Sequence, residues 1–566
     1  MSNDAEQPKP KQDAALAEKL CRRWQVMQAD RMPFLSIWQE IADLMATRSG
    51  GINTKVETPD TAKDSALFDT TAGDALLSMA GGLMSWTMPV NEPWFNFEPI
   101  RELRGSERTR RWSMECSELA REYLGNSAYY TEAHEDLLSH CGFATSAMYF
   151  NIEEGKLRFE HLPTGSYCIE ENAFGVVDTL FREFEWTVEK AEDYFGEENL
   201  SEATQKLCKG DKERQSKIKI LHAVYRRSDS ERPSDPLARR AGWGKEFASY
   251  YVESAQKHIL REGGFDYFPF SVGRYLKWTA LSGNAPYGYG PGFAALPDTR
   301  QINFLQMVMD CEAEKRVRPP MIADERMEGD LILSAGGINY IAQGMFEPRP
   351  IPVEGNYQIG VDRYKMRQDM IRAKFHAQLF NMFEGLDGIR TATEINERAA
   401  EKITTITPAF SRIANEKHTP MLQALFAMWL ENGMLPTPPQ EAIQPVSDTM
   451  GFVPAPVVTF SSRLALAIKN LRNVQADRHI QRIVSIAPLR PEVLEPFDWI
   501  KWARGSAEDS GVPSEYLLPE EVVQQNMQAK AQAATAAAQM QMMETGAKAV
   551  GAVGGPEGIK QLSQAA

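Results

Sequence analysis

A glycine-rich turn is the part of the sequence that most resembles a chemical site. Gly288, Gly290 and Gly292 come shortly before an expected helix, and glycines in such a turn can bring a backbone close to the phosphates of a nucleotide. A dinucleotide-binding turn, however, leads directly from a hydrophobic strand into a helix. Here Pro291 interrupts the loop and no clean strand precedes it. We interpret the glycines as a structural hinge and keep a nucleotide-binding enzyme as the alternative.

Other chemical signatures are weaker still. His134 and His140 do not have the i, i+4 spacing of a zinc protease, so we read both as ordinary helix residues. The six cysteines are scattered without CxxC spacing, which indicates neither a zinc ribbon nor a disulfide framework. The sequence has no GxxxxGK[ST] loop and no GxSxG motif. We therefore expect no catalytic, cofactor-binding or metal-binding residues, no cofactor, and a structural protein rather than an enzyme.

Composition limits the possible partners. The chain has 566 residues, 43% of them hydrophobic, and a net charge of -15, so it can bury sizeable cores but is not built as a whole to grip phosphate backbones. No stretch reaches the length of a membrane span, and the polar N-terminus is unlike a signal peptide. We expect an unexported protein, made in the cytoplasm, that does not act at a membrane.

One long helix is the element around which the rest is organised. Pro297 suits a first helical position, Asp298 places a negative charge by the positive end of the helix dipole, and Pro319-Pro320 cannot continue the helix. The sequence therefore predicts a helix over 297–317, roughly 30 Å long. Its second half is charged, with Asp310, Glu312 and Glu314 among its acidic residues.

A second helix is expected to pair with the first. Helical spacing resumes at about 361–383, after short strands and glycine turns over 323–355 that are too small to bury a core alone. This order suggests an antiparallel pair with the small excursion at its tip. The basic residues of this region fit two interpretations equally, contact with DNA phosphates or salt contact with a neighbouring acidic helix; they are Lys365, Arg367, Arg372, Lys374 and Arg390.

The rest of the chain predicts a mixed α+β fold that is predominantly helical. Two-residue alternation marks strands at 156–162, 182–186 and 218–224, within a small α+β unit at about 150–285. Pro408 and Pro420 should kink or divide a long helix that starts near Thr391. Helical periodicity is expected at 16–44, 67–88, 107–124, 132–148, 464–511 and, in an alanine-rich run, after Pro519.

Four segments together resemble a known family. They are LFDTTAGDALLSMAGGLMSWTMPVNEPWF (67–95), LFREFEWT (180–187), YGYGPGFAALPDTRQINFL (287–305) with PPM at 319–321, and RTATEINER (390–398). Their order and sequence are similar to those of the portal, or head-to-tail connector, proteins of short-tailed bacteriophages. The tail beyond Pro519 is the weakest match.

The resemblance implies a ring, typically of twelve subunits, around a DNA channel at one vertex of the virion capsid. It also implies an arrangement of parts along this chain. They are a tail at 1–13, a wing at 14–296, stem helices at 297–317 and 357–384, a clip at 318–356, a channel loop at 385–391, a kinked helix and linker at 392–456, a crown at 457–518, a possible barrel helix at 519–550 and a disordered tail at 551–566.

The same resemblance implies partners and roles. They are other copies of the chain, the major capsid protein, scaffolding protein, the terminase packaging motor, a tail adaptor and double-stranded DNA. Lys374 and Arg390 become candidates for facing DNA, and Asp324, Glu325 and Arg326 become candidate clip contacts for the motor or the adaptor. A different ring of the phage tail, such as an adaptor, is a further alternative.

Overall fold

The computed structural model separates the chain into two units, residues 1–468 and 469–566. It describes 14–49, 51–53, 67–233, 244–279, 286–352, 357–377 and 407–461, excepting 154, 211, 328–329, 335, 342 and 448–449, together with parts of 479–542. Among these residues, no helix combines the length and the apolar run that a membrane crossing requires.

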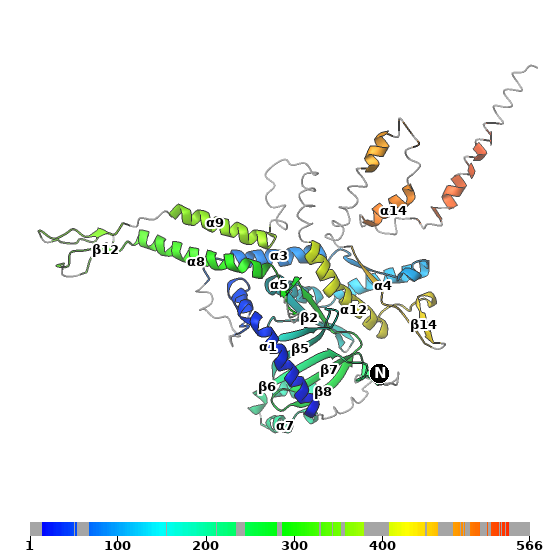
Figure 1. The fold of residues 1–566 in the computed structure, drawn as a ribbon, viewed down its shortest axis with the longest axis horizontal. Helices are drawn as coiled ribbons and strands as arrows, with labels where there is room; N and C mark the ends of the chain where they lie inside the picture. The colour runs from blue at the N-terminus through cyan, green and yellow to red at the C-terminus, as the bar shows by residue number, and fades with distance from the viewer. Residues whose placement is uncertain are drawn as a thin grey trace, which may run out of the picture. The chain divides into compact units, whose positions relative to one another are not determined.

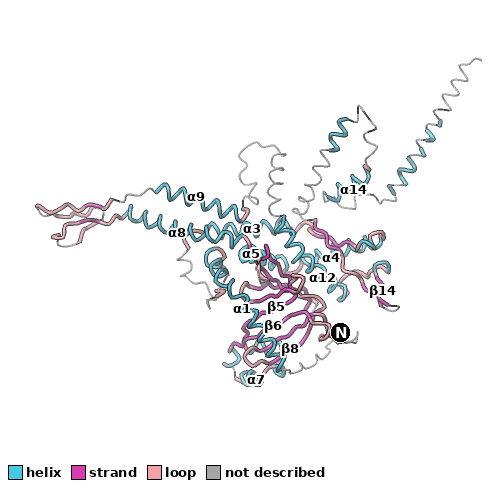
Figure 2. Tube along the Cα trace, viewed as in Figure 1, coloured by secondary structure: helices cyan, strands magenta, loops and turns pink. Residues whose placement is uncertain are grey.

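Two antiparallel sheets form the centre of the first unit (Figure 2). The strands expected at 156–162, 182–186 and 218–224 are all present, in β3, β5 and β6. One sheet has the order β3-β2-β9 and the other β4-β5-β6-β7-β8. Their bounds are β2 Thr145–Glu153, β3 Lys156–Leu162, β4 Tyr167–Glu171, β5 Val177–Thr187, β6 Lys217–Arg226, β7 Phe247–Glu253, β8 His258–Phe265 and β9 Phe270–Arg274.

The five-stranded sheet is covered on both faces because successive strand residues point to opposite sides. Leu221 packs in the cluster formed with helix α1 (Ala14–Leu44), which crosses the sheet in Figure 1. Its neighbour Ile220 packs instead in the cluster formed with helix α6 (Val188–Phe195). Leu20, Trp24 and Met27 of α1 supply the apolar stripe that the helical spacing predicted.

Three helices pack with the smaller sheet in the largest core. They are α3 (Thr71–Thr87), α4 (Glu107–Gly125) and α5 (Tyr129–Phe143). The prediction that the last of these continues to 148 is wrong. Ala144 adopts a left-handed conformation with φ of 61°, which ends α5, and the chain enters β2 at Thr145.

The glycines of the turn at 288–292 allow its backbone to pack closely against the end of α5 and the start of β2. A Cβ on Gly288 would lie 2.1 Å from the carbonyl oxygen of Ala144, and one on Gly292 would lie 2.0 Å from that of Gly142. The backbone of the α5–β2 junction therefore occupies the space that a nucleotide phosphate would need. Pro291 is the first residue of the following helix, so the alternative of a nucleotide site at this turn is not supported.

A π-helix connects the described end of the kinked helix to α12 (Thr419–Glu431). Pro420, where a kink or division was expected, lies in the first turn of α12 directly after the π-helix. Proline lacks the N–H that would donate to the carbonyl four residues earlier. The backbone N–H of Thr419 donates instead to the carbonyl of Ala414. The wide turn of the π-helix, Ala414–His418, leaves the side chain of Lys417 directed into the core.

Lys417 forms a buried ion pair with Asp136 of α5; both side chains are 3% exposed. The ammonium also donates to the hydroxyl of Ser146 at 2.8 Å. Burial opposes ionisation of Asp136, but Lys417 and then His161 outweigh it and lower the pKa of the carboxyl. Gly273 is required beside this pair, because a Cβ there would lie 2.3 Å from Cδ of Lys417.

Short strands follow α12. Hairpin β14–β15 (Gln444–Ser447 and Met450–Phe452) lies within the expected linker, and β16 (Val457–Phe460) pairs antiparallel with β1 (Phe95–Glu98). The first four residues of the expected crown, 457–460, therefore belong to the sheet structure of the first unit instead. The second unit contains α14 (Trp499–Asp509) and helical residues within 479–486 and 522–542.

Acid is expected to destabilise the first unit through buried histidines, among them His140 and His418. Burial, with Lys417 nearby, lowers the pKa of His140 and of His418 to about 3, and an unfolded histidine titrates near about 6.5. Below pH 6.5 the unfolded chain takes up protons that the folded chain refuses. Stability should therefore fall by about 1.4 kcal/mol per pH unit for each histidine, until about pH 3.

The variant His418→Phe tests this pH dependence. Neither ring nitrogen of His418 has a hydrogen-bond partner among the described residues, and the ring packs against Trp94 with centroids 5.5 Å apart, so phenylalanine should fit. We predict a shallower decline of stability between pH 6.5 and 4, measured by denaturant unfolding at each pH. An unchanged slope would rule out His418 as one of the groups responsible.

Candidate functional site

A long helical hairpin extends from the core of the first unit (Figure 1). Helix α8 spans Pro291–Val317, so it begins before the expected Pro297, which lies inside the helix. Its 27 residues give about 40 Å rather than the expected 30 Å. Helix α9 spans Tyr357–Lys374, so the second expected helix starts earlier than 361; residues 378–383 lie outside the described residues.

Contacts along the hairpin establish its antiparallel register. Near the tip, the Arg316 guanidinium lies 5.8 Å from the ring centroid of Tyr357. At the base, Lys374 Nζ donates to the carbonyl of Ala294 at 2.8 Å. The sequence therefore predicted the pairing and direction of the two helices correctly, although it misplaced their ends.

Asp298 holds the two helices together at their base. Its side chain is 4% exposed and forms ion pairs with both Arg367 and Lys374 of α9. Burial raises the pKa of Asp298, but hydrogen bonds from Lys374 and Arg367 outweigh it, so the net shift is downward. The expectation that Asp298 lies by the positive end of the helix dipole is wrong, because α8 begins at Pro291 and Asp298 lies beyond its first turn. Asp298 instead neutralises two cations from the other helix.

Residues just before α3 form hydrogen bonds with both helices at the base of the hairpin. Asn303 accepts hydrogen bonds from the backbone N–H groups of Phe68 and Asp69, at 2.9 and 3.1 Å. Tyr364 of α9 donates to the Asp69 carboxylate at 2.6 Å. Burial and this hydrogen bond raise the pKa of Tyr364 to about 12, so its hydroxyl remains a donor. The hairpin is thus fixed to the core by polar contacts from both helices.

The hairpin carries few buried residues beyond this base. After Asn303, Met309 is the last buried residue of α8, and Ile371 is the one buried residue within α9. Asp310 and Glu314 are exposed, and Glu312 pairs with Arg316 at 2.6 Å. Large apolar side chains are also left exposed along the two helices, namely Phe304, Met307, Val308, Val317, Ile359, Met366 and Met370.

The tip contains two short paired strands, β12 (Met321–Ile322) and β13 (Arg349–Pro350). Asp324 organises the chain between them, since its carboxylate pairs with Arg326 at 2.8 Å and accepts the backbone N–H of Phe346 at 3.1 Å. These hydrogen bonds lower the pKa of Asp324. Asp324 and Arg326 are therefore paired with each other within the tip, and both Glu325 and Arg326 are exposed.

The candidate DNA-facing residues have different positions. Lys374 is engaged with Asp298, which is the ionic helix contact that the sequence left open as one of two interpretations. Lys365 and Arg372 are exposed, the latter 3.6 Å from Asp369. Arg390, the channel loop at 385–391 and the helix start at Thr391 lie outside the described residues.

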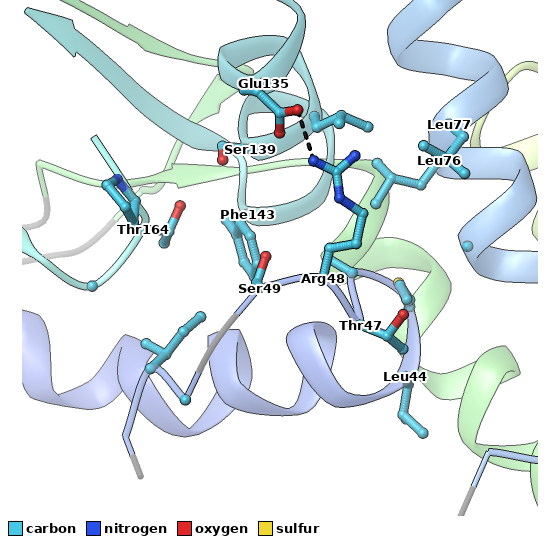
Figure 3. A pocket seen from close by; sticks show the side chains of 18 of the residues that line it. Leu44, Thr47, Arg48, Ser49, Leu76, Leu77, Glu135, Ser139, Phe143 and Thr164 are labelled. Carbon is cyan, nitrogen blue, oxygen red and sulfur yellow. Dashed lines mark hydrogen bonds and ion pairs between the residues drawn. The ribbon is translucent and has the colours of Figure 1, made fainter. Parts of the chain in front are cut away.

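A pocket of about 580 Å³ lies between the end of α1, the start of α3, α5 and residues 163–166. Figure 3 shows Arg48 and Glu135 at this pocket, joined by an ion pair of 2.7 Å. Most of its wall is apolar, from side chains such as Leu44, Leu76 and Phe143. Sequence reasoning missed the pocket because its wall comes from segments far apart in the chain.

Ser139, His161 and Asp136 near this pocket have the composition of a catalytic triad but not its geometry. Ser139 Oγ lies 3.0 Å from His161 Nε2, but His161 Nδ1 is 3.8 Å from Asp136, too far for a hydrogen bond. Lys417 already neutralises Asp136. Ser139 also lies within α5, where the neighbouring N–H groups bond to the helix rather than to an oxyanion. This arrangement therefore supports no nucleophilic mechanism.

Loss of the Asp298 carboxylate should loosen the hairpin. We predict that Asp298→Asn destabilises α8 and α9 by about 2–3 kcal/mol, less than for a fully buried pair because Arg367 and Lys374 are 28% and 33% exposed. Hydrogen exchange in the two helices should accelerate. The matched control Glu312→Gln breaks an exposed pair on α8 and should cost under about 0.5 kcal/mol. Equal effects would contradict the role of Asp298.

Comparison with known proteins places the chain among phage structural proteins. Two curated relatives match almost throughout. "Probable portal protein" of Bordetella phage BPP-1 is 27% identical over 555 residues, which cover 96% of each chain. "Portal protein" of Salmonella phage epsilon15 is 24% identical over 558 residues, which cover 97% of this chain and 95% of that one.

A chain from the solved virion of native gene transfer agent (GTA) particle matches over 78% of this chain and 93% of its own, at 10% identity. Its TM-score of 0.33 is too low to bear on the fold. A family model, in contrast, matches residues 17–518, which include the sheets, the hairpin, its tip and α14. The chain belongs to the family of bacteriophage head to tail connecting proteins.

Proposed function

We propose that this protein is the portal of a short-tailed phage: a ring of identical subunits at one capsid vertex, through which double-stranded DNA enters and leaves the head. The observation that carries the proposal is the hairpin of α8 and α9, which extends about 40 Å and leaves apolar side chains uncovered in a single subunit. Exposed apolar surface of this kind marks a contact with another protein. Full-length similarity to two phage portal proteins supports the same assignment.

In this ring, which we propose to be a dodecamer, the α8–α9 hairpins form the stem around the channel. The net charge of -15 per subunit keeps DNA from adhering along the passage, because each phosphate contact that released counterions would retain the strand. Arg390 remains the candidate cation at the channel loop. Lys374 contributes mainly by fixing α9 to α8, through its ion pair with Asp298.

The tip forms the clip that receives the packaging motor and later the tail adaptor. The Asp324–Arg326 pair maintains the shape of the tip, and the contacts come from Glu325 and from exposed apolar side chains. Three of these are among the most exposed in the described chain: Tyr340 at 89%, Leu333 at 71% and Ile338 at 67%. The wing would contact the major capsid protein and scaffolding protein within the virion.

Ring formation and channel charge can be tested together. Negative-stain images of the purified protein should show rings with a central hole of about duplex width, whereas monomers at all concentrations would contradict the proposal. Arg390→Glu should leave the rings intact and change the amount of DNA retained in filled heads, since it reverses a charge at the constriction. Unchanged packaging and retention would remove Arg390 from the channel surface.

The clip assignment predicts specific neighbours. A photo-reactive residue replacing Tyr340 should cross-link to the packaging motor in assembling heads and to the tail adaptor in finished virions. The same residue replacing Val26 of α1, which is 56% exposed, serves as the control and should reach neither protein. Cross-links from position 340 only to proteins inside the capsid would overturn the assignment.

A further inference from the structure

A cluster of arginines projects from the start of α4. Between 101 and 111 the chain has five arginines and two glutamates, although acidic residues exceed basic ones over the whole sequence. All five arginines are exposed. We name them the arginine cluster; they are Arg101, Arg104, Arg108, Arg110 and Arg111.

Three of the five arginines are not held in ion pairs by the described residues of the subunit. Arg104 pairs with Glu98 at 3.2 Å, and Arg108 lies 3.9 Å from Glu441 with its own side chain 84% exposed. The other three arginines of the cluster have neither ion-pair nor hydrogen-bond partners among the described residues. The glutamates of the same stretch, Glu102 and Glu107, are exposed and likewise unpaired there. Five arginines against these four glutamates leave an excess of one positive charge, and the three arginines without ion-pair partners among the described residues face solvent.

The backbone beneath the cluster is held in place. Ser106 caps α4 by accepting the N–H of Thr109 at 3.3 Å and also contacts Glu441. The indole N–H of Trp112 donates to the carbonyl of Pro436 at 2.9 Å, and Trp112 itself is buried. Because this backbone is already fixed, little conformational entropy is lost when its arginines bind a ligand.

We propose that the arginine cluster binds the phosphate backbone of double-stranded DNA. Guanidinium groups match phosphate in charge and in paired hydrogen-bond geometry, and a duplex offers a dense, regular row of phosphates to several arginines at once. In Figure 1, α4 lies on the other side of the core from the hairpin tip at β12, so this contact is separate from the stem. This inference rests on the proposed portal function, because a portal is the setting in which the protein would meet packaged DNA.

The test is binding of a fluorescent duplex to the full-length protein over a range of salt concentrations. The variant Arg101→Gln, Arg110→Gln, Arg111→Gln should weaken binding by about tenfold or more. It should also reduce the slope of log K against log salt by about 0.9 for each phosphate that the variant no longer neutralises. A control triple variant removes three other exposed arginines, Arg22→Gln, Arg48→Gln and Arg226→Gln, and should bind as the natural protein does.

Two further measurements make the outcome decisive. Substituting lysine for the same three arginines keeps the charge and should retain most of the salt slope, even if the glutamine variant folds poorly. Equal slopes in the natural and glutamine proteins would overturn the proposal. So would arginine-dependent binding of polyglutamate without such binding of duplex, which would indicate an acidic protein partner instead.

Ring images from the same samples separate this inference from the portal proposal. Rings that persist in the glutamine variant while duplex binding is lost support the arginine cluster as a distinct site. Arginine-dependent duplex binding by a natural protein that forms no rings would count against the portal proposal and not against the cluster.

Discussion

The ion pairs of Asp298 are the interaction on which the projecting part of the molecule depends. A carboxylate that is 4% exposed cannot remain charged without partners, and both its partners come from α9. Beyond this level the two helices share little buried surface within one subunit. Charge neutralisation at the base thus fixes the direction of an arm whose remaining surface is available to other molecules.

A second buried ion pair has the same role inside the core. Lys417 reaches Asp136 because the π-helix directs it inward and because Gly273 leaves room for its side chain. It joins the π-helix that leads into α12 to the smaller sheet and to α5. In both places a buried charge is tolerated because its partner comes from a different element, so the charge links elements as well as being neutralised by them.

The distribution of exposed residues separates three kinds of surface. The hairpin and its tip expose apolar side chains, which favour protein contacts. The start of α4 exposes guanidinium groups, which favour phosphate. The pocket beside α5 has a mostly apolar wall, and its charged pair, Arg48 and Glu135, is neutralised internally. A connecting protein needs surfaces of the first two kinds, because its work is to hold other molecules.

Local pattern in the sequence determined the elements and their order: the amphipathic α1, the alternating strands, the antiparallel hairpin and the small tip. Periodicity and proline or glycine signals act over a few residues, so they are readable without the fold. The predicted helix ends were less accurate than the predicted elements. Helix α8 starts where Gly290 and Gly292 pack against the α5–β2 junction, and α5 ends because Ala144 adopts a left-handed conformation that no sequence motif marked.

Only the tertiary structure decided which charges are neutralised. Asp298 and Lys374, or Asp136 and Lys417, are far apart in the chain, and a side chain's partner depends on the elements that pack beside it. For the same reason the sequence did not point to the arginine cluster, because only the folded structure shows which of its arginines lack ion-pair partners among the described residues.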